Sequence, residues 1–228
     1  MKLWIDVEGG GMVSGSISLP QDERKTVNRS PGVILAHGAG GHKDHPALDQ
    51  FARGLAEAAH PVLRFNFLYS ESGRKVPDRP PILAAAWEAA HRAFTACKDC
   101  ELDSIVAAGK SMGGRIASEL VAAGRLPVKA LVFLGYPLHP AGRPERLRDV
   151  HLYRIPVPML FFAGTRDSLC NLDLLRGVLA RLEAPWTLEV VEAGDHSFTL
   201  PRSAAESSAE VYGRLASRTA SWLAGLSG

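Results

Sequence analysis

The sequence predicts an α/β fold in which a mostly parallel eight-stranded sheet has helices on both faces. Apolar runs of strand length alternate along the 228 residues with amphipathic stretches of helical length, and this alternation is typical of a parallel sheet with helical crossovers. Hydrophobic residues make up 46% of the chain and charged residues 22%, which is enough apolar material for one sizeable core. With no internal repeat or low-complexity tract, residues 1–228 are expected to form a single domain.

Short apolar runs predict the strands. They are expected near residues 2–7, 12–19, 32–36, 61–67, 104–109, 128–134, 157–163 and 186–192. Three glycines, Gly9-Gly10-Gly11, separate the first two and indicate a hairpin. In the second strand, apolar or small residues alternate with serines, which is typical of a half-exposed edge strand; these are Val13, Gly15, Ile17 and Leu19.

Helical periodicity predicts five longer helices, near residues 46–59, 81–97, 112–124, 171–183 and 203–224. Pro46 is well placed to start the first of them, because proline is favoured in the first turn. In the last, residues at helical spacing form a face that is expected to pack on the sheet; they are Ala209, Tyr212, Leu215, Ala216, Thr219 and Trp222.

The most informative motif follows the fifth expected strand. Gly109-Lys110-Ser111-Met112-Gly113 comes directly after the apolar residues 105–108. G-x-S-x-G is the pattern of a nucleophile elbow, in which a sharp strand-to-helix turn exposes a serine. The serine holds a strained backbone, and the flanking positions are glycines because a Cβ atom does not fit there. Such a serine suits attack on an acyl carbon.

A phosphate-binding loop is the competing interpretation, since Gly109-Lys110-Ser111 also resembles the end of a Walker A motif. That motif requires a glycine at position 104, where this chain has Ser104. Residues 105–108 are also apolar and strand-like, which does not suit a phosphate cradle. We therefore favour the nucleophile elbow, provided that the serine has chemical partners.

Candidate partners follow two later strands. Asp167 comes after the strand expected at 157–163, and His196 comes after the strand expected at 186–192. The order Ser, Asp, His is the order expected after an elbow of this kind, and the carboxyl ends of parallel strands share one edge of a sheet. We expect His196 to take the proton of Ser111 and Asp167 to fix the tautomer of the imidazole.

Two other carboxylates compete for the role of Asp167. Asp195 adjoins the histidine and is expected to point elsewhere on the turn, and Asp173 is expected to begin a helix. Asp167 therefore remains the favoured acid.

An oxyanion site is predicted after the third strand, where an apolar run leads into His37-Gly38-Ala39-Gly40-Gly41. An HG-type loop at this place supplies one backbone N–H to the oxyanion, and the residue after the nucleophile supplies the other. We assign these donors to Ala39 and Met112.

With these motifs, the chain resembles the α/β-hydrolase superfamily over nearly its whole length, and within it the dienelactone-hydrolase-like group. It is most similar to the hydrolase-like domain shared by the testis-expressed protein 30 and non-specific-lethal complex subunit 3 families. The closer likeness rests on Phe65-Asn66-Phe67, Gly73-Arg74-Lys75, Pro77-Asp78-Arg79, Gly135-Tyr136-Pro137-Leu138-His139-Pro140, Gly164-Thr165-Arg166-Asp167 and Gly194-Asp195-His196-Ser197-Phe198.

The resemblance implies an α/β-hydrolase fold over residues 1–228, with a Ser-His-Asp triad at Ser111, His196 and Asp167. Dienelactone hydrolases proper use a cysteine where this chain has Ser111, so their substrate is not carried over. Some members of the closer families are subunits of chromatin complexes, so the resemblance also implies a role in protein interactions.

The stretch from Gly135 to Pro156 is too short for a large lid domain, and we expect it to hold a loop and one short helix near 144–150. The site should therefore be open, which disfavours long triglycerides. The loops 68–80 and 136–148 are expected to shape specificity. Their basic residues, with Lys110, suit an acidic acyl substrate, although local surface ion pairs are the favoured interpretation. Lys110 is expected to be solvent-facing or structural.

Other chemistry is not favoured. His37, His42 and His45 cluster in one loop, but no carboxylate or thiol completes a metal site. We interpret Cys97 and Cys100 as ordinary helix-end residues, and Cys170 as a thiol that borders the site without being its nucleophile.

Composition also bounds partners and compartment. A formal net charge of +2 does not suggest nucleic acid. Three cysteines indicate a reducing compartment, and neither a signal peptide nor a membrane span is evident. We expect a cytoplasmic protein without a cofactor.

The expected function is therefore that of a serine hydrolase that cleaves a small or accessible carboxylic ester or thioester through an acyl-enzyme. The alternative is a protein-interaction module, with weak or no catalysis, on the same scaffold.

Overall fold

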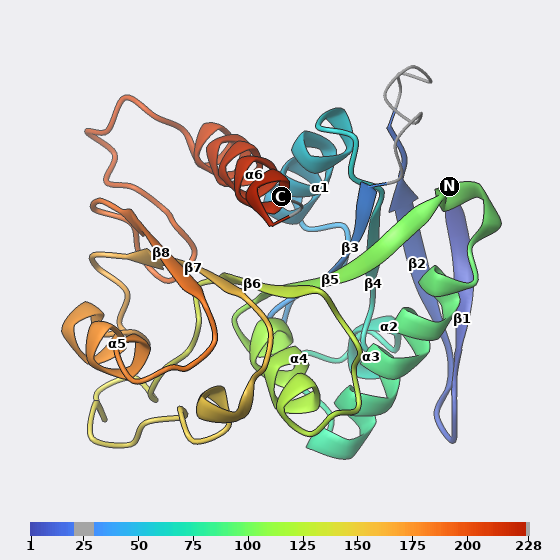
Figure 1. The fold of residues 1–228 in the computed structure, drawn as a ribbon, viewed down its shortest axis with the longest axis horizontal. Helices are drawn as coiled ribbons and strands as arrows, with labels where there is room; N and C mark the ends of the chain where they lie inside the picture. The colour runs from blue at the N-terminus through green and yellow to red at the C-terminus, as the bar shows by residue number, and fades with distance from the viewer. Residues whose placement is uncertain (21–29, 227–228) are drawn as a thin grey trace.

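An eight-stranded sheet runs through the part of the chain that the computed structural model describes, residues 1–20 and 30–226 (Figure 1). The strands lie in the order β1-β2-β4-β3-β5-β6-β7-β8. The pairs β1–β2 and β2–β4 are antiparallel and the other five are parallel. The mostly parallel sheet predicted from the sequence is confirmed. Its strands are β1 (Lys2–Val7), β2 (Gly11–Ser18), β3 (Ser30–Ala36), β4 (Val62–Phe65), β5 (Leu102–Lys110), β6 (Ala130–Leu134), β7 (Met159–Gly164) and β8 (Trp186–Val191).

Helices cover both faces of the sheet (Figure 1). On one face lie α1 (Pro46–Glu57) and α6 (Ser208–Gly225); on the other lie α2 (Leu68–Glu71), α3 (Pro80–Thr95), α4 (Met112–Ala122) and α5 (Leu172–Leu179). The apolar residues of β5 alternate between two buried clusters, with Val106 on the α1 and α6 side and Ala107 on the α3 and α4 side. Two hydrophobic cores thus hold the sheet between the helical layers.

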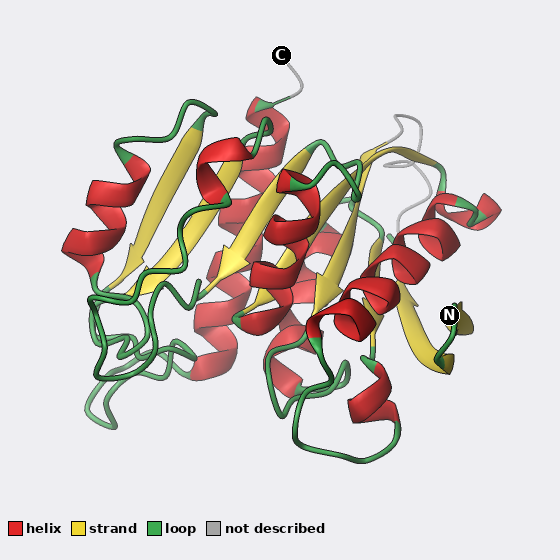
Figure 2. Ribbon diagram, turned by 90° about the horizontal axis from the view of Figure 1, so that it is seen from below, coloured by secondary structure: helices red, strands yellow, loops and turns green. Residues whose placement is uncertain are grey.

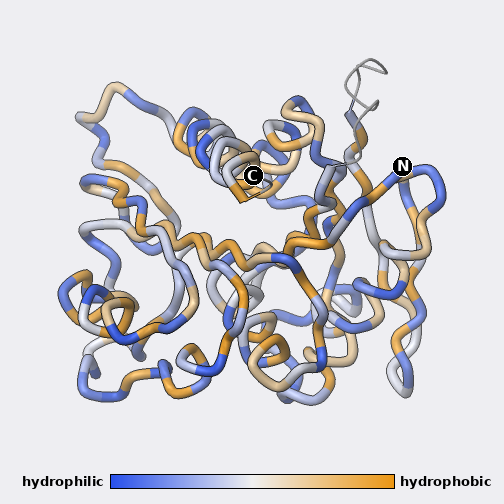
Figure 3. Tube along the Cα trace, viewed as in Figure 1, coloured by the Kyte–Doolittle hydropathy of each residue, from blue (hydrophilic) through white to orange (hydrophobic). Residues whose placement is uncertain are grey.

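The central strands are the most apolar part of the chain, as the orange segments of Figure 3 show. Every residue of β6 and β7 is buried. Such continuous apolar runs are expected of parallel strands that are covered on both faces. In Figure 2 the arrowheads of the parallel strands point to one edge of the sheet, where many of the loops gather.

The ends of the helices follow local capping signals. Pro46 is the first residue of α1, as expected. Helix α6 begins at Ser208 rather than near 203, because Ser207 and Glu210 form a reciprocal capping box there. The expected sheet-facing residues of α6 are buried except Ala209, which is exposed, and Trp222, which is half-buried.

Two expectations about smaller elements were wrong. The segment 144–150 does not form a helix, because the N–H of Arg148 bonds to Leu138 and its carbonyl accepts from Tyr136. Those bonds hold the segment against the preceding loop, and a short 3-10 turn, η3 (Leu152–Arg154), follows it. No lid domain is inserted between β6 and β7.

The second wrong expectation concerns β2, which was expected to be an edge strand. It is not at the edge of the sheet, because β1 pairs along its outer side.

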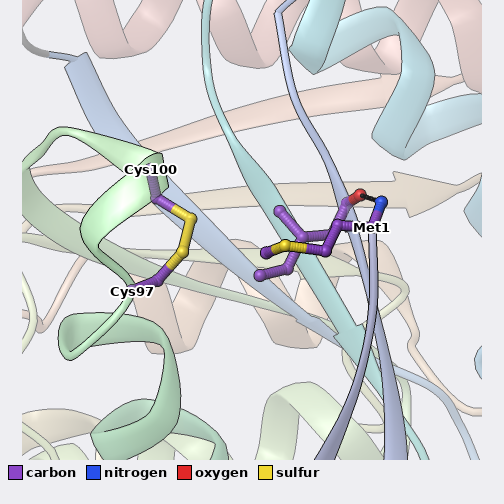
Figure 4. The surroundings of a disulfide bond; sticks show 4 residues. Met1, Cys97 and Cys100 are labelled. Carbon is purple, nitrogen blue, oxygen red and sulfur yellow. Dashed lines mark hydrogen bonds between the residues drawn. A yellow bond between two sulfur atoms is a disulfide. The ribbon is translucent and has the colours of Figure 1, made fainter.

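The interpretation of Cys97 and Cys100 was also wrong, because the two form a disulfide. A 3-10 turn, η2 (Lys98–Cys100), follows α3 and brings their Cα atoms to 5.5 Å, a separation that suits a disulfide. Figure 4 shows the bond at this turn, with the side chain of Met1 pointing in its direction. The count of three cysteines was therefore a poor guide to disulfide bonding.

No helix in the described ranges is both long and apolar enough to cross a membrane.

Candidate active site

Ser111 lies on a strained turn between β5 and α4. Its φ of 50° and ψ of −115° place it outside the conformations that non-glycine residues usually adopt. A Cβ at Gly109 would lie 2.2 Å from the backbone nitrogen of Gly114, and a Cβ at Gly113 would lie 2.6 Å from the carbonyl oxygen of His37. Glycine is therefore required at both positions, because a Cβ atom there would collide with backbone atoms that have no room to move aside.

The structure brings together the three residues that the sequence singled out. The Nε2 atom of His196 lies 2.8 Å from the Oγ of Ser111, and its Nδ1 atom lies 2.8 Å from Oδ2 of Asp167. Each residue follows the carboxyl end of a strand, β5, β7 or β8. Three loops that are distant in sequence thus form one hydrogen-bonded chain.

Asp167 is well placed to orient the imidazole. Its side chain is fully buried, and Oδ1 accepts the backbone N–H of Leu169 at 2.8 Å, which leaves Oδ2 for His196. The carboxylate can only accept a hydrogen bond from Nδ1–H, so Nε2 faces the hydroxyl of Ser111 as an acceptor. This is the tautomer that a general base needs.

The competing carboxylates are engaged elsewhere. Asp195 accepts the backbone N–H groups of Ser197 and Thr199 and so shapes the turn that carries the histidine. Asp173 lies in the first turn of α5 and pairs with Arg176 on the exposed face of that helix. Neither carboxylate is bonded to the imidazole of His196.

The loop after β3 is held by His37 as a structural side chain. Its Nδ1–H donates to the carbonyl of Gly38 at 2.8 Å, and its Nε2 accepts the backbone N–H of Phe67 at 3.2 Å. The hydroxyl of Tyr69 donates to the same carbonyl at 3.1 Å. Burial lowers the pKa of His37 to about 4, against the opposing effect of the Gly38 bond, so the ring is neutral at pH 7.

The backbone N–H groups of Ala39 and Met112 are available to a ligand. Within residues 1–20 and 30–226, neither donates a hydrogen bond to another part of the chain. The loop also lies against the serine, since a Cβ at Gly38 would be 3.4 Å from the Cβ of Ser111. Met112 is the first residue of α4, so the positive end of that helix dipole faces the turn.

A cavity of about 470 Å³ opens at Ser111 and His196. Residues at the starts of two helices contribute to its wall: the N-cap residue His45 with Ala47 and Leu48 of α1, and Ser208 and Tyr212 of α6. The loops 68–80 and 136–148, which were expected to shape specificity, contribute no residue to this wall. Helices α1 and α6 reach this cavity because they pack together on one face of the sheet, and loop composition does not reveal that packing.

The basic side chains of those loops have local roles. Arg74 pairs with Asp78, and Arg148 donates to the carbonyl of Pro137. His139 accepts the backbone N–H of Asn171 with Nε2 and so connects its loop to the segment after Asp167. Among these described contacts, the one between Arg74 and Asp78 is an ion pair of the expected kind.

Lys110, Cys170 and the clustered histidines take no direct part in the hydrogen-bonded chain. The ammonium of Lys110 donates to the carbonyl oxygen of His196 at 2.6 Å, which is a structural contact. Cys170 is a buried free thiol, and burial raises its pKa to about 12, so it is a poor nucleophile. Among the described residues, no cluster of three or more His, Cys, Asp or Glu is suited to a metal ion.

Comparisons with known proteins agree with this architecture. The alpha/beta hydrolase domain family matches residues 29–224. The fold is similar to that of a dienelactone hydrolase from Anabaena variabilis, at 21% identity over 99% of this chain and 96% of the other, with a TM-score of 0.75. It is also similar to a serine hydrolase without a lid from Xanthomonas campestris, at 21% identity, 97% and 94% coverage and a TM-score of 0.71. A third similar structure is Est1E from Butyrivibrio proteoclasticus with bound ferulic acid, at 15% identity, 98% and 99% coverage and a TM-score of 0.74.

The turn at Ser111 predicts a strong difference between two glycine substitutions. Gly109→Ala should lower the free energy of unfolding by about 3 kcal/mol or more, because its Cβ meets backbone atoms. Gly177→Ala, in α5, has open space around it and should raise stability by about 0.5–1 kcal/mol. Urea unfolding of both variants tests this; similar stabilities would contradict it.

The buried neutral ring of His37 predicts a loss of stability in acid. The unfolded histidine binds its proton near pH 6.5 and the folded one near pH 4, so the stabilisation is complete above pH 6.5 and declines as the pH falls toward 4. The expected contribution is about 3 kcal/mol. Urea unfolding at pH 7 and pH 4.5 should show a smaller loss for His37→Gln than for the wild type. Equal losses would exclude this role for His37.

Proposed function

This chain belongs to the α/β-hydrolase domain family, and from that premise we propose that it is a serine hydrolase. Its substrate is a small or accessible carboxylic ester or thioester. The observation that carries the proposal is the position of His196, whose two ring nitrogens lie 2.8 Å from Ser111 and from Asp167. That arrangement supplies a nucleophile, a general base and an orienting carboxylate in hydrogen-bonding contact.

In the proposed first step, the Oγ of Ser111 attacks the acyl carbon while Nε2 of His196 takes the hydroxyl proton. Asp167 accepts the Nδ1 hydrogen bond throughout and stabilises the imidazolium that forms. The carbonyl oxygen becomes an oxyanion that accepts hydrogen bonds from the N–H groups of Ala39 and Met112. One such donor typically contributes about 3–4 kcal/mol to stabilisation of the transition state.

In the second step, His196 gives its proton to the departing alcohol or thiol, and the acyl group remains on Ser111. The free imidazole then takes a proton from water, which attacks the acyl-enzyme through the same oxyanion site. The acid leaves, the proton returns to the Oγ of Ser111, and the enzyme is restored. Every proton in this cycle passes through one nitrogen atom, Nε2 of His196.

The cavity supports a small acyl or alcohol group. Its volume of about 470 Å³ is toward the lower end of ligand sites in proteins, and no lid domain supplies an apolar cover. Apolar side chains, including Leu48 and Leu169, contribute to its wall beside hydroxyl-bearing ones, including Thr199 and Ser208. Two similar structures support this proposal. The serine hydrolase from Xanthomonas campestris has no lid, and Est1E from Butyrivibrio proteoclasticus has ferulic acid, a small acid, bound to it.

The proposal predicts that labelling by a fluorophosphonate probe depends on Ser111 and His196. Ser111→Ala should abolish labelling and lower ester turnover about a millionfold while leaving the fold intact, because the triad acts as a unit. His196→Ala should have a comparable effect. Cys170→Ala is the matched control and should retain labelling, because that thiol lies outside the cavity wall. A folded wild type that resists the probe, or labelling that survives in Ser111→Ala, would contradict the proposal.

The size of the cavity predicts a preference for short acyl chains. Among p-nitrophenyl esters, acetate and butyrate should give a kcat/KM at least about tenfold above that of palmitate, because the long chain lacks an apolar cover and stays in water. The measurement is initial hydrolysis rates below the solubility limit of each ester. A preference for palmitate would contradict the assignment of the substrate to small esters.

A further inference from the structure

Lys110 connects the strand that carries the serine to the loop that carries the histidine. It is the last residue of β5, directly before Ser111, and its Nζ donates to the carbonyl oxygen of His196 at 2.6 Å across 86 residues of sequence. A hydrogen bond from an ammonium group is roughly twice as strong as one between neutral groups. We propose that Lys110 is a positioning residue that holds the main chain of His196 where the imidazole meets Ser111 and Asp167 together.

The carbonyl of His196 depends on this donor. Within the described ranges, no other group donates to that oxygen. The neighbouring residues are held by a different device, since the carboxylate of Asp195 accepts the N–H groups of Ser197 and Thr199. Asp195 therefore holds the residues that follow the histidine, whereas Lys110 holds the main chain of His196 itself.

Gly135, directly after β6, keeps the space for this contact. Its φ is 74°, and a Cβ there would lie 2.8 Å from the carbonyl oxygen of His196 and 3.4 Å from Nζ of Lys110. The same Cβ position is 3.5 Å from Cε1 of the imidazole. The ends of β5 and β6 and the histidine loop thus meet at the Lys110–His196 bond, close to the reacting ring.

The surrounding charges keep Lys110 protonated. Burial lowers its pKa to about 8, but Asp167 and Asp195 oppose that effect, so the group is mainly an ammonium at pH 7. Lys110 also lines the cavity, which makes direct binding of an anionic substrate the rival role. The geometry supports positioning, because the 2.6 Å bond from Nζ ends on the main chain of the residue that carries the imidazole.

The inference rests on the proposed function, because positioning matters to turnover only when Ser111 and His196 react. Lys110→Met removes the donor but keeps the length of the side chain. We expect kcat for a neutral ester to fall about 10–100-fold, with KM changed less than about twofold, because a displaced base loses rate rather than binding. Lys110→Arg keeps a cationic donor and should recover most of the rate.

Controls separate this role from the others. Lys98→Met removes the same charge from an exposed turn at the opposite end of β5 and should leave kcat unchanged. A neutral ester and a succinate half-ester are compared for each variant. An unchanged kcat in Lys110→Met would overturn the inference, and so would a rise in KM confined to the half-ester. The latter result would make Lys110 a substrate-binding group.

A crystal structure of Lys110→Met supplies a readout that does not depend on activity. We expect the distance between Nε2 of His196 and Oγ of Ser111 to exceed hydrogen-bonding range in the variant, and to remain 2.8 Å in Lys110→Arg. Unchanged contacts in Lys110→Met would overturn the positioning role even if the protein proved not to be a hydrolase. Failure of the proposed function itself appears separately, as a wild type that resists the fluorophosphonate probe.

Discussion

The backbone of Ser111 is the constraint on which the rest of the site depends. A residue with a φ of 50° and a ψ of −115° stores strain of about 1–3 kcal/mol, and packing on both sides must offset it. Gly109 and Gly113 allow β5 and α4 to approach closely at this turn, and the indole of Trp87 donates to the carbonyl of Gly113 from α3. The layered cores on the two faces of the sheet therefore hold the serine in a conformation that it would not adopt alone.

Hydrogen bonds between loops then place the other groups around that serine. His37 joins its loop to Phe67, His139 joins its loop to Asn171, and Lys110 joins β5 to His196. All three bonds end on main-chain atoms, so they fix the path of a loop rather than a single rotamer. Parallel strands bring the loops to one edge of the sheet. The hydrogen bonds then fix the loops so that His196 lies 2.8 Å from each of its two partners, Ser111 and Asp167.

Much of this arrangement was predictable from the sequence because it depends on local rules. The spacing of Gly109, Ser111 and Gly113 follows from the steric requirement of a single turn. Asp167 and His196 follow strands whose apolar runs can be recognised in the sequence. The cavity wall was not predictable in this way, since α1 and α6 reach it only through packing against each other and the sheet. The disulfide of Cys97 depends on a short 3-10 turn whose geometry no periodicity reveals.

The central claim is that Ser111 attacks an acyl carbon while two backbone N–H groups hold the oxyanion. A crystal structure of the protein after reaction with a fluorophosphonate tests it most directly, because the tetrahedral adduct resembles the proposed intermediate. The account predicts a bond from the Oγ of Ser111 to phosphorus, with the phosphonyl oxygen within hydrogen-bonding distance of the N–H groups of Ala39 and Met112. An adduct on another side chain, or a phosphonyl oxygen directed away from both donors, would contradict it.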